Sequence, residues 1–267
     1  MVIQNLINCM SKLIACWGAP GVGNTTFAVS LAKQIATMPS ENNPSTKNQV
    51  AVIFASQLCP TFTTLYPQAI PNVNNPNKKD KSIGNIFALT NPSVNDILEQ
   101  AEVVPSVKNI IYLGYAYGQN PITYSSPVEE DIFHFFYELS KITDYIIVDC
   151  CSDMKDLLTQ FSLKEADYIF QTCGCDYKSM CFFVSNLKRL PLNDNVRDEN
   201  RVRVFPNVKN GESPYDLSGF YGKNFFEFKN NKDIYDLSYS GILLVSPNPS
   251  QYTTSMKEII RSVMFIG

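Results

Sequence analysis

The stretch Gly18-Ala-Pro-Gly-Val-Gly-Asn-Thr-Thr26 decides the fold, because it stands between an apolar run and a segment of helical periodicity. The apolar run Leu13–Trp17 predicts a buried strand, and apolar residues recur at helical spacing in Thr25–Ala36. A glycine-rich turn between a strand and a helix lets backbone N–H groups turn inward and surround an anion. The positive end of the helix dipole favours the same anion. The stretch therefore predicts a loop that binds phosphate groups.

This loop fits the pattern G-x-x-x-x-G-K-[ST] at every defined position except one. Its residues are all predicted to surround the phosphates: Gly18, Ala19, Pro20, Gly21, Val22, Gly23, Asn24, Thr25 and Thr26. Thr25 occupies the position whose hydroxyl normally coordinates Mg²⁺, whereas Asn24 replaces the lysine by a neutral amide donor. Losing one transition-state donor costs roughly 10²–10³-fold in rate. We therefore expect a nucleotide to bind with weak or absent hydrolysis, and a glycine-rich turn without a ligand is the alternative.

Strands and helices are predicted to alternate along most of the chain. After the first strand, the predicted strands are Val50–Ala55, Asn109–Leu113, Tyr145–Val148, Asp167–Gln171, Arg201–Phe205 and Ile242–Val245. After the first helix, the predicted helices are Ser93–Val103, Pro127–Ser140, Lys155–Ala166, Lys178–Arg189 and Ser250–Met264. The alternation predicts an α/β fold: a doubly wound, mostly parallel sheet flanked by helices in three Rossmann-like layers. Residues 1–267 are expected to form a single P-loop domain, with 1–11 as an N-terminal extension.

The composition excludes several classes of function. The chain has 267 residues and a net charge of −3, so it has no general attraction to nucleic-acid backbones. With one histidine, His134, chemistry built on several histidines, such as a multi-histidine metal site, is nearly excluded, and the eight cysteines form no C-x-x-C pair. Most of these cysteines lie in apolar runs, where they are expected to pack as small hydrophobes rather than to hold an iron–sulfur cluster. Without a signal peptide or a long apolar span, the chain is predicted to be cytoplasmic.

Several segments resemble the ParA/MinD family of P-loop ATPases. Trp17–Ala36 is similar to the family's first strand, loop and helix, and Asp144-Tyr-Ile-Ile-Val-Asp149 resembles its Walker B strand, D-[YF]-hhh-D. The resemblance spans most of residues 12–264 and implies ATP or ADP as ligand. It also implies that Mg²⁺ is held by Thr25 and, through water, by Asp149. A solvated aspartate at the end of a strand is the alternative for Asp149.

Two later segments extend this resemblance. Leu163–Phe170 resembles the family stretch that enters the next strand. Val204–Val208 resembles the segment whose asparagine contacts adenine, which assigns base binding to Asn207. An asparagine in a turn at the end of a strand is an equal alternative for this position.

Three departures from the family pattern all weaken hydrolysis. Asn24 replaces the lysine of the loop, and Ala19 stands where the family has a signature lysine that reaches across a dimer. The family usually follows its second strand with D-x-D, whereas Ser56–Pro60 contains no carboxylate. Asp153 is a candidate substitute for the missing base, although an ordinary loop aspartate is the simpler interpretation.

Within the family, the chain is most similar to the divergent TadZ/CpaE-like branch. That resemblance implies a nucleotide-binding positioning or assembly factor for pilus, secretion, conjugation or DNA partition machinery. It also implies a homodimer with protein partners, whereas the charge does not indicate DNA binding. Two other functions stay open: a pseudo-ATPase scaffold that dimerises without nucleotide, and an ATP-dependent small-molecule enzyme on the same fold.

Two further features concern surfaces. The amphipathic segment Ser255–Met264 carries few cations, so we expect it to pack on the sheet rather than attach to a membrane. Four tyrosines gather around one loop, either as a partner surface or as a cover for the sheet edge: Tyr112, Tyr115, Tyr117 and Tyr124.

Overall fold

A computed structural model describes residues 11–41, 43–67, 80–124, 127–187 and 200–264. Its strands form one sheet in the order β3-β4-β2-β5-β1-β6-β7-β8, in which β3 is antiparallel to β4 and the other pairs are parallel. The strands are β1 (Lys12–Gly18), β2 (Val50–Phe54), β3 (Glu102–Val103), β4 (Ile110–Gly114), β5 (Tyr145–Asp149), β6 (Tyr168–Thr172), β7 (Arg201–Val208) and β8 (Phe225–Lys229). The predicted mostly parallel, doubly wound α/β fold is confirmed. Most of the expected extension, residues 1–10, lies outside the described residues.

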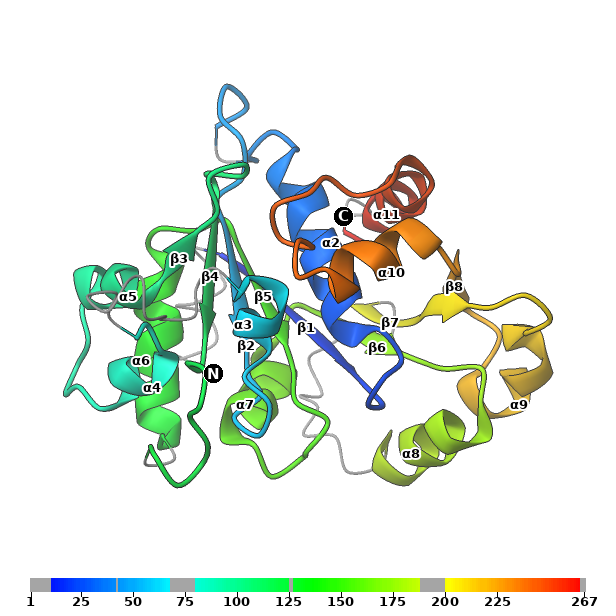
Figure 1. The fold of residues 1–267 in the computed structure, drawn as a ribbon, viewed down its shortest axis with the longest axis horizontal. Coiled ribbons are helices and arrows are strands. Elements are labelled where there is room, and N and C mark those ends of the chain that lie inside the picture. Colours follow the sequence, from blue (N-terminus) through cyan, green and yellow to red (C-terminus); the bar gives the residue numbers. More distant parts are fainter. Residues whose placement is uncertain (1–10, 42, 68–79, 125–126, 188–199, 265–267) are drawn as a thin grey trace.

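Helices cover both faces of the sheet (Figure 1). On one face lie α2 (Asn24–Ala36), α3 (Thr61–Leu65), α10 (Lys232–Tyr239) and α11 (Ser250–Val263). On the other lie α4 (Ile83–Phe87), α5 (Val94–Gln100), α6 (Glu129–Ser140), α7 (Leu157–Glu165), α8 (Tyr177–Leu187) and α9 (Ser218–Tyr221), the last preceded by the short 3-10 helix Pro214–Leu217. The sheet therefore separates two apolar cores, as expected for three layers.

Strand β1 lies inside the sheet and is buried on both faces. Leu13, Ala15 and Trp17 point into one core, and Ile14 and Cys16 point into the other. A parallel strand with two covered faces is apolar at consecutive positions rather than at alternate ones. This explains why the apolar run was a reliable signal for the strand that leads into the loop.

The prediction of a strand at Ile242–Val245 is wrong. This segment forms turns after α10, and its apolar side chains Leu243 and Leu244 are buried in the same core as α2. The Nζ of Lys33, on α2, donates to the carbonyl oxygens of Leu243 (2.7 Å) and Ser246 (2.9 Å). Because the Lys33 side chain satisfies both carbonyls, the segment is held without joining the sheet.

The edge strand beside β7 is β8, which the sequence analysis did not predict. Phe225–Lys229 pairs in parallel with β7, and α10 follows directly. Its sequence, FFEFK, is short and mixes charges with aromatics, so it gives no continuous apolar run. The consequence for the site is large, because β8 brings Asn230 beside the end of β7.

The two surface expectations have different outcomes. Helix α11 packs on the sheet as predicted, with Tyr252, Met256, Ile259 and Ile260 buried. Within the described ranges, no helix is long and apolar enough to cross a membrane.

The four tyrosines do not form one cluster, because Tyr112 is buried in one core and Tyr115 in the other. Tyr112 and Tyr115 are buried, and the ring of Tyr115 packs against that of Tyr124 at a centroid distance of 6.1 Å. Of the four tyrosines, Tyr117 is the exposed one, with 62% of its surface accessible to solvent.

Candidate functional site

The predicted phosphate loop connects β1 to α2 at the carboxyl edge of the sheet (Figure 1). Gly21 and Gly23 adopt positive φ angles of 81° and 99°, which L side chains rarely adopt. Gly18 has no room for a side chain, because a Cβ there would lie 2.2 Å from the backbone oxygen of Thr172. Glycine is thus favoured at Gly21 and at the two positions where the pattern defines it, Gly18 and Gly23.

Asn24 begins α2 and points back into the sheet rather than outward. Its Nδ2 donates to the carbonyl oxygen of Cys16 at 3.0 Å and to Oδ1 of Asp149 at 2.7 Å. Its Oδ1 accepts a hydrogen bond from the Thr172 hydroxyl at 2.8 Å. One amide therefore ties together the ends of β1, β5 and β6. This use of Asn24 was not visible in the sequence, because its partners are up to 148 residues away.

Asp149 is the last residue of β5 and lies next to the loop, as predicted. Its side chain is buried, and the Thr25 hydroxyl donates to Oδ2 at 2.7 Å. Burial raises the pKa of Asp149 to about 6, while the hydrogen bonds from Thr25 and Asn24 act in the opposite direction. Asp149 is thus a buried carboxylate whose two oxygens are held by neutral donors.

The pair formed by Thr25 and Asp149 fits the inner part of a magnesium site. A hydroxyl and a carboxylate are oxygen ligands of the kind that Mg²⁺ prefers, and Mg²⁺ usually takes one or two protein oxygens and completes its shell with water and phosphate. No cluster of three or more His, Cys, Asp or Glu side chains that could hold a metal occurs in the described part of the chain. Any Mg²⁺ here would take its remaining ligands from water and phosphate.

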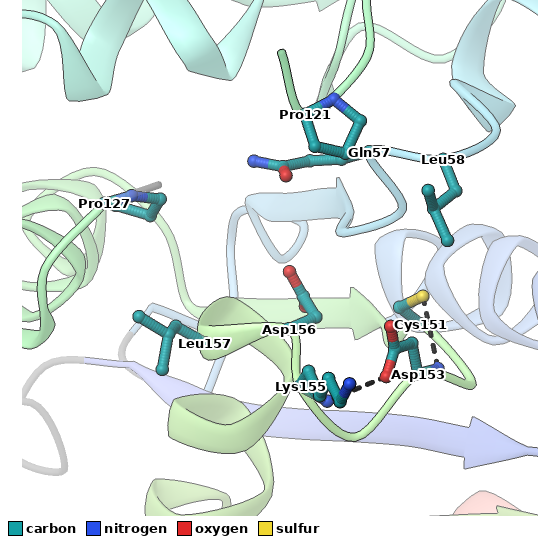
Figure 2. Close-up of a pocket in the computed structure, with 9 residues that line it drawn as sticks. All are labelled: Gln57, Leu58, Pro121, Pro127, Cys151, Asp153, Lys155, Asp156 and Leu157. Carbon is teal, nitrogen blue, oxygen red and sulfur yellow. Dashed lines mark hydrogen bonds between the residues drawn. The ribbon is translucent and has the colours of Figure 1, made fainter. Parts of the chain in front are cut away.

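A second pocket lies beside the loop that follows β5, between Cys151–Leu157 and the segment after β2. Figure 2 shows Gln57 and Pro121 across this pocket from Asp153 and Asp156. Asp153 is exposed, and its Oδ1 accepts from the backbone N–H of Lys155 at 2.9 Å. That contact is typical of an aspartate that stabilises a turn, which favours the simpler interpretation of Asp153.

A third pocket is lined by residues of the phosphate loop and by Asn207. This pocket, of about 230 Å³, is lined by Gly21, Gly23, Thr26, Pro206, Asn207, Asn230, Asn231, Ile234, Tyr235, Ser238 and Tyr252. We call it the loop–Asn207 pocket. It connects the predicted phosphate-binding and base-binding residues in one continuous space. Its walls from α10 and from Asn230 and Asn231, which follow β8, were missed, because neither β8 nor α10 was predicted.

The remaining candidates have structural roles. His134 Nε2 lies 3.0 Å from the carbonyl oxygen of Pro92, which fixes the ring against the start of α5. Burial raises the pKa of the Cys16 and Cys150 thiols well above the usual range, so they stay protonated and pack as hydrophobes.

Comparisons with known proteins place this geometry in a wider context. No protein-family model and no curated protein sequence matches the chain. Solved structures do match it along almost its whole length. A ParA family ATPase from Chlorobium tepidum TLS superimposes with a TM-score of 0.69 at 14% identity, covering 93% of this chain and 98% of that one. The fold is that of the ParA and MinD ATPases.

Two further structures agree. The MinD cell division protein of Aquifex aeolicus gives a TM-score of 0.62 at 13% identity, covering 94% of this chain and 96% of that one. A putative plasmid partition protein from Borrelia burgdorferi B31, bound to AMPPNP, gives 0.63 at 13% identity, covering 96% and 99%. At such low identity the ParA/MinD likeness establishes the fold, and the roles of individual residues depend on the site geometry.

Proposed function

We propose that this chain is a ParA/MinD-like positioning or assembly factor that binds ATP or ADP with Mg²⁺ and hydrolyses ATP weakly or not at all. The observation that carries the proposal is the direct contact between Thr25 and Asp149 at the end of a glycine-rich loop that has Asn24 in place of lysine. The loop–Asn207 pocket supplies space for a nucleoside next to that contact.

Each part of the site has a distinct task in this proposal. The backbone N–H groups of Gly18–Thr26 and the dipole of α2 bind the phosphates. Thr25 and ionised Asp149 would hold Mg²⁺, which neutralises phosphate charge when bound. Asn207, which lines the same pocket, would contact the base.

The same residues explain why hydrolysis should be slow. Asn24 is already hydrogen-bonded at both ends of its amide, so it offers the γ-phosphate neither a charge nor a free donor directed at it. None of the residues lining the loop–Asn207 pocket is basic. The segment Ser56–Pro60 has no carboxylate to orient an attacking water. The site is therefore better suited to holding a nucleotide than to cleaving it.

The partners are part of the same proposal. We infer a homodimer that recruits protein partners of a pilus, secretion, conjugation or partition apparatus, as in the TadZ/CpaE-like branch. A MinC:MinD complex from Aquifex aeolicus, which matches this chain with a TM-score of 0.64, supports partner binding on this fold. The net charge of −3 gives no support to DNA as the partner.

Titration calorimetry with ADP and excess Mg²⁺ tests nucleotide binding directly. We expect binding in the micromolar range that weakens when EDTA replaces Mg²⁺. Absence of binding with the ligand at millimolar concentration would overturn the proposal. Light scattering on the same samples then separates the scaffold alternative, since a dimer of unchanged mass without any nucleotide binding is what a pseudo-ATPase scaffold requires.

A further inference from the structure

We propose that the ring of Tyr235 is the surface on which the nucleobase stacks in the loop–Asn207 pocket. A nucleotide would then be held at its phosphates by the loop and at the flat face of its base by a side chain of α10. The inference rests on the proposed function and adds to it a residue that binds the base through its ring.

One side of α10 faces the pocket. The pocket is lined by the N-cap residue of this helix and by three residues within it, at the spacing i, i+3, i+4 and i+7: Asn231, Ile234, Tyr235 and Ser238. Residues at this spacing lie on the same face of a helix. Tyr235 therefore belongs to the pocket-facing side of α10.

The position of α10 is fixed at its start. The backbone N–H of Asn230 donates to the carbonyl oxygen of Val208 at 2.8 Å, which ties the approach to the helix to the end of β7. Oδ1 of Asn231 accepts a hydrogen bond from the N–H of Ile234 at 3.1 Å and so caps the helix. The side chain of Ile234 is buried in the same core as α2. Because Ile234 is anchored there, its neighbour Tyr235 is held at the edge of the pocket.

A second tyrosine orients the ring of Tyr235. Tyr239 lies about one turn further along α10, and the two rings are within 12° of parallel, with their centroids 6.2 Å apart. At this distance the rings are offset, so they overlap only in part. The pair lies largely outside the core, with 64% of Tyr235 and 83% of Tyr239 exposed. Much of the Tyr235 ring is thus available to a ligand, and its orientation is supported before the ligand binds, which lowers the entropic cost of stacking.

The other wall of the pocket adjoins the phosphate loop. A Cβ on Gly23 would lie 3.4 Å from Cγ of Pro206, so Pro206 stands directly beside the loop. Pro206 from β7 and Tyr235 from α10 line the same pocket, and every residue that lines it is neutral. Apolar and aromatic walls with neutral polar groups suit a flat, uncharged group. A purine base joined to phosphates in the loop has this chemistry.

Stacking has an energetic signature that separates it from phosphate binding. Removing an aromatic ring from under a base costs about 1–3 kcal/mol, which corresponds to about fivefold or more in affinity. The phosphates bind through the loop, whose residues are not changed by a substitution on α10. A ligand without a base should therefore be insensitive to the loss of the Tyr235 ring.

Titration calorimetry in Mg²⁺ with two probes, ADP and pyrophosphate, tests the inference. Tyr235→Ala should weaken ADP binding by about fivefold or more and leave pyrophosphate binding unchanged. Tyr235→Phe keeps the ring and removes only the hydroxyl, so it should bind both probes as the unmodified protein does.

Tyr177→Ala is the matched control. Tyr177 begins α8, on the other face of the sheet (Figure 1), and is 75% exposed. This variant removes the same ring from an exposed helical position outside the pocket, so its ADP affinity should equal that of the unmodified protein. Circular dichroism checks that each variant is folded.

Several results would overturn the inference. Unchanged ADP affinity in folded Tyr235→Ala would contradict it and leave the phosphate loop as proposed. An equal loss of pyrophosphate affinity would assign the effect to the loop, and an equal loss in Tyr235→Phe would assign it to the hydroxyl. A similar loss in Tyr177→Ala would show that the effect is not specific to the pocket. If the unmodified protein binds neither probe, the proposed function itself fails, and this inference fails with it.

Discussion

The amide of Asn24 donates to the carboxylate of Asp149 across 2.7 Å, and so joins the first residue of α2 to the last residue of β5. The usual loop has a lysine at this position. Here the same amide also binds the carbonyl of Cys16 and the hydroxyl of Thr172. Asn24 is thus a structural crosslink at the edge of the sheet, and its role in the fold is separable from any role toward phosphate.

This crosslink predicts a loss of stability in Asn24→Ala. The change leaves Asp149 with one neutral donor fewer and removes the acceptor of the Thr172 hydroxyl. Because a buried polar group without a hydrogen-bond partner costs about 1–3 kcal/mol, the free energy of unfolding in urea should fall by that amount. The exposed Asn207 is the control, since Asn207→Ala should change stability by less than about 0.5 kcal/mol. Equal stability of Asn24→Ala and the unmodified protein would show that the crosslink is not significant.

Restoring the lysine should affect binding and turnover differently. Asn24→Lys places a positive charge beside buried Asp149 and within reach of the phosphates, so ADP should bind more tightly than to the neutral variant Asn24→Met. Steady-state ATP hydrolysis should stay slow, because Ala19 and Ser56–Pro60 still lack the second lysine and the carboxylate. A rise in turnover of 10²-fold or more in Asn24→Lys would mean that Asn24 alone limits hydrolysis.

The contact between Thr25 and Asp149 predicts how binding depends on Mg²⁺. Thr25→Ala removes a hydroxyl that donates to Asp149 at 2.7 Å and is the predicted magnesium ligand. The gain in ADP affinity on adding Mg²⁺ should shrink by about tenfold, because Mg²⁺ loses a protein oxygen ligand. Thr25→Ser retains the hydroxyl and should behave like the unmodified protein. If Thr25→Ala keeps the full magnesium effect, the predicted metal role is wrong.

The raised pKa of Asp149 predicts a characteristic dependence on pH. The folded value of about 6 lies above the ordinary value of 3.8, so the folded protein binds more protons than the unfolded chain between these limits. The contribution of Asp149 to stability is therefore present below about pH 4 and lost as the pH rises through 6. Relative to Asp149→Asn, the unmodified protein should lose stability from pH 4 to 6 and then level off, as measured by urea unfolding. A difference that is independent of pH would contradict the assignment.

Ionisation of the same group should govern the magnesium effect. The carboxylate must be charged to hold Mg²⁺, so the magnesium-dependent gain in ADP affinity should decline below about pH 6. Calorimetry at pH 5 and pH 7 measures this gain, with EDTA as the reference at each pH.

The close approach of Gly18 to β6 predicts a severe effect of one methyl group. A Cβ at position 18 would lie 2.0 Å from Oγ1 and 2.2 Å from the backbone oxygen of Thr172, and the backbone cannot yield cheaply. Gly18→Ala should therefore lower the free energy of unfolding by more than about 3 kcal/mol and lower the thermal midpoint strongly. Gly219→Ala meets no atom within 4 Å and should leave the midpoint almost unchanged. Comparable midpoints for the two variants would disprove the close packing.

Much of this molecule could be predicted where local sequence determines structure. Continuous apolar runs identified the strands on both sides of β1, and the glycine pattern identified the loop. The strand β8 was missed, and Ile242–Val245 was wrongly predicted as a strand. The conformation of a short apolar segment depends on distant contacts, such as the one that Lys33 makes with Leu243. The partners of Asn24 and the pairing of Asn207 with Asn230 join residues far apart in the chain, so no local pattern could reveal them.

The most direct test of the central claim is to identify the nucleotide that stays with the protein after incubation with labelled ATP and Mg²⁺. The protein is kept in excess, passed through a desalting column and analysed by thin-layer chromatography. The account predicts that bound label is recovered as intact ATP after a time in which an active ATPase would convert all of it. Recovery of bound ADP, or failure to retain any nucleotide at saturating concentration, would contradict it.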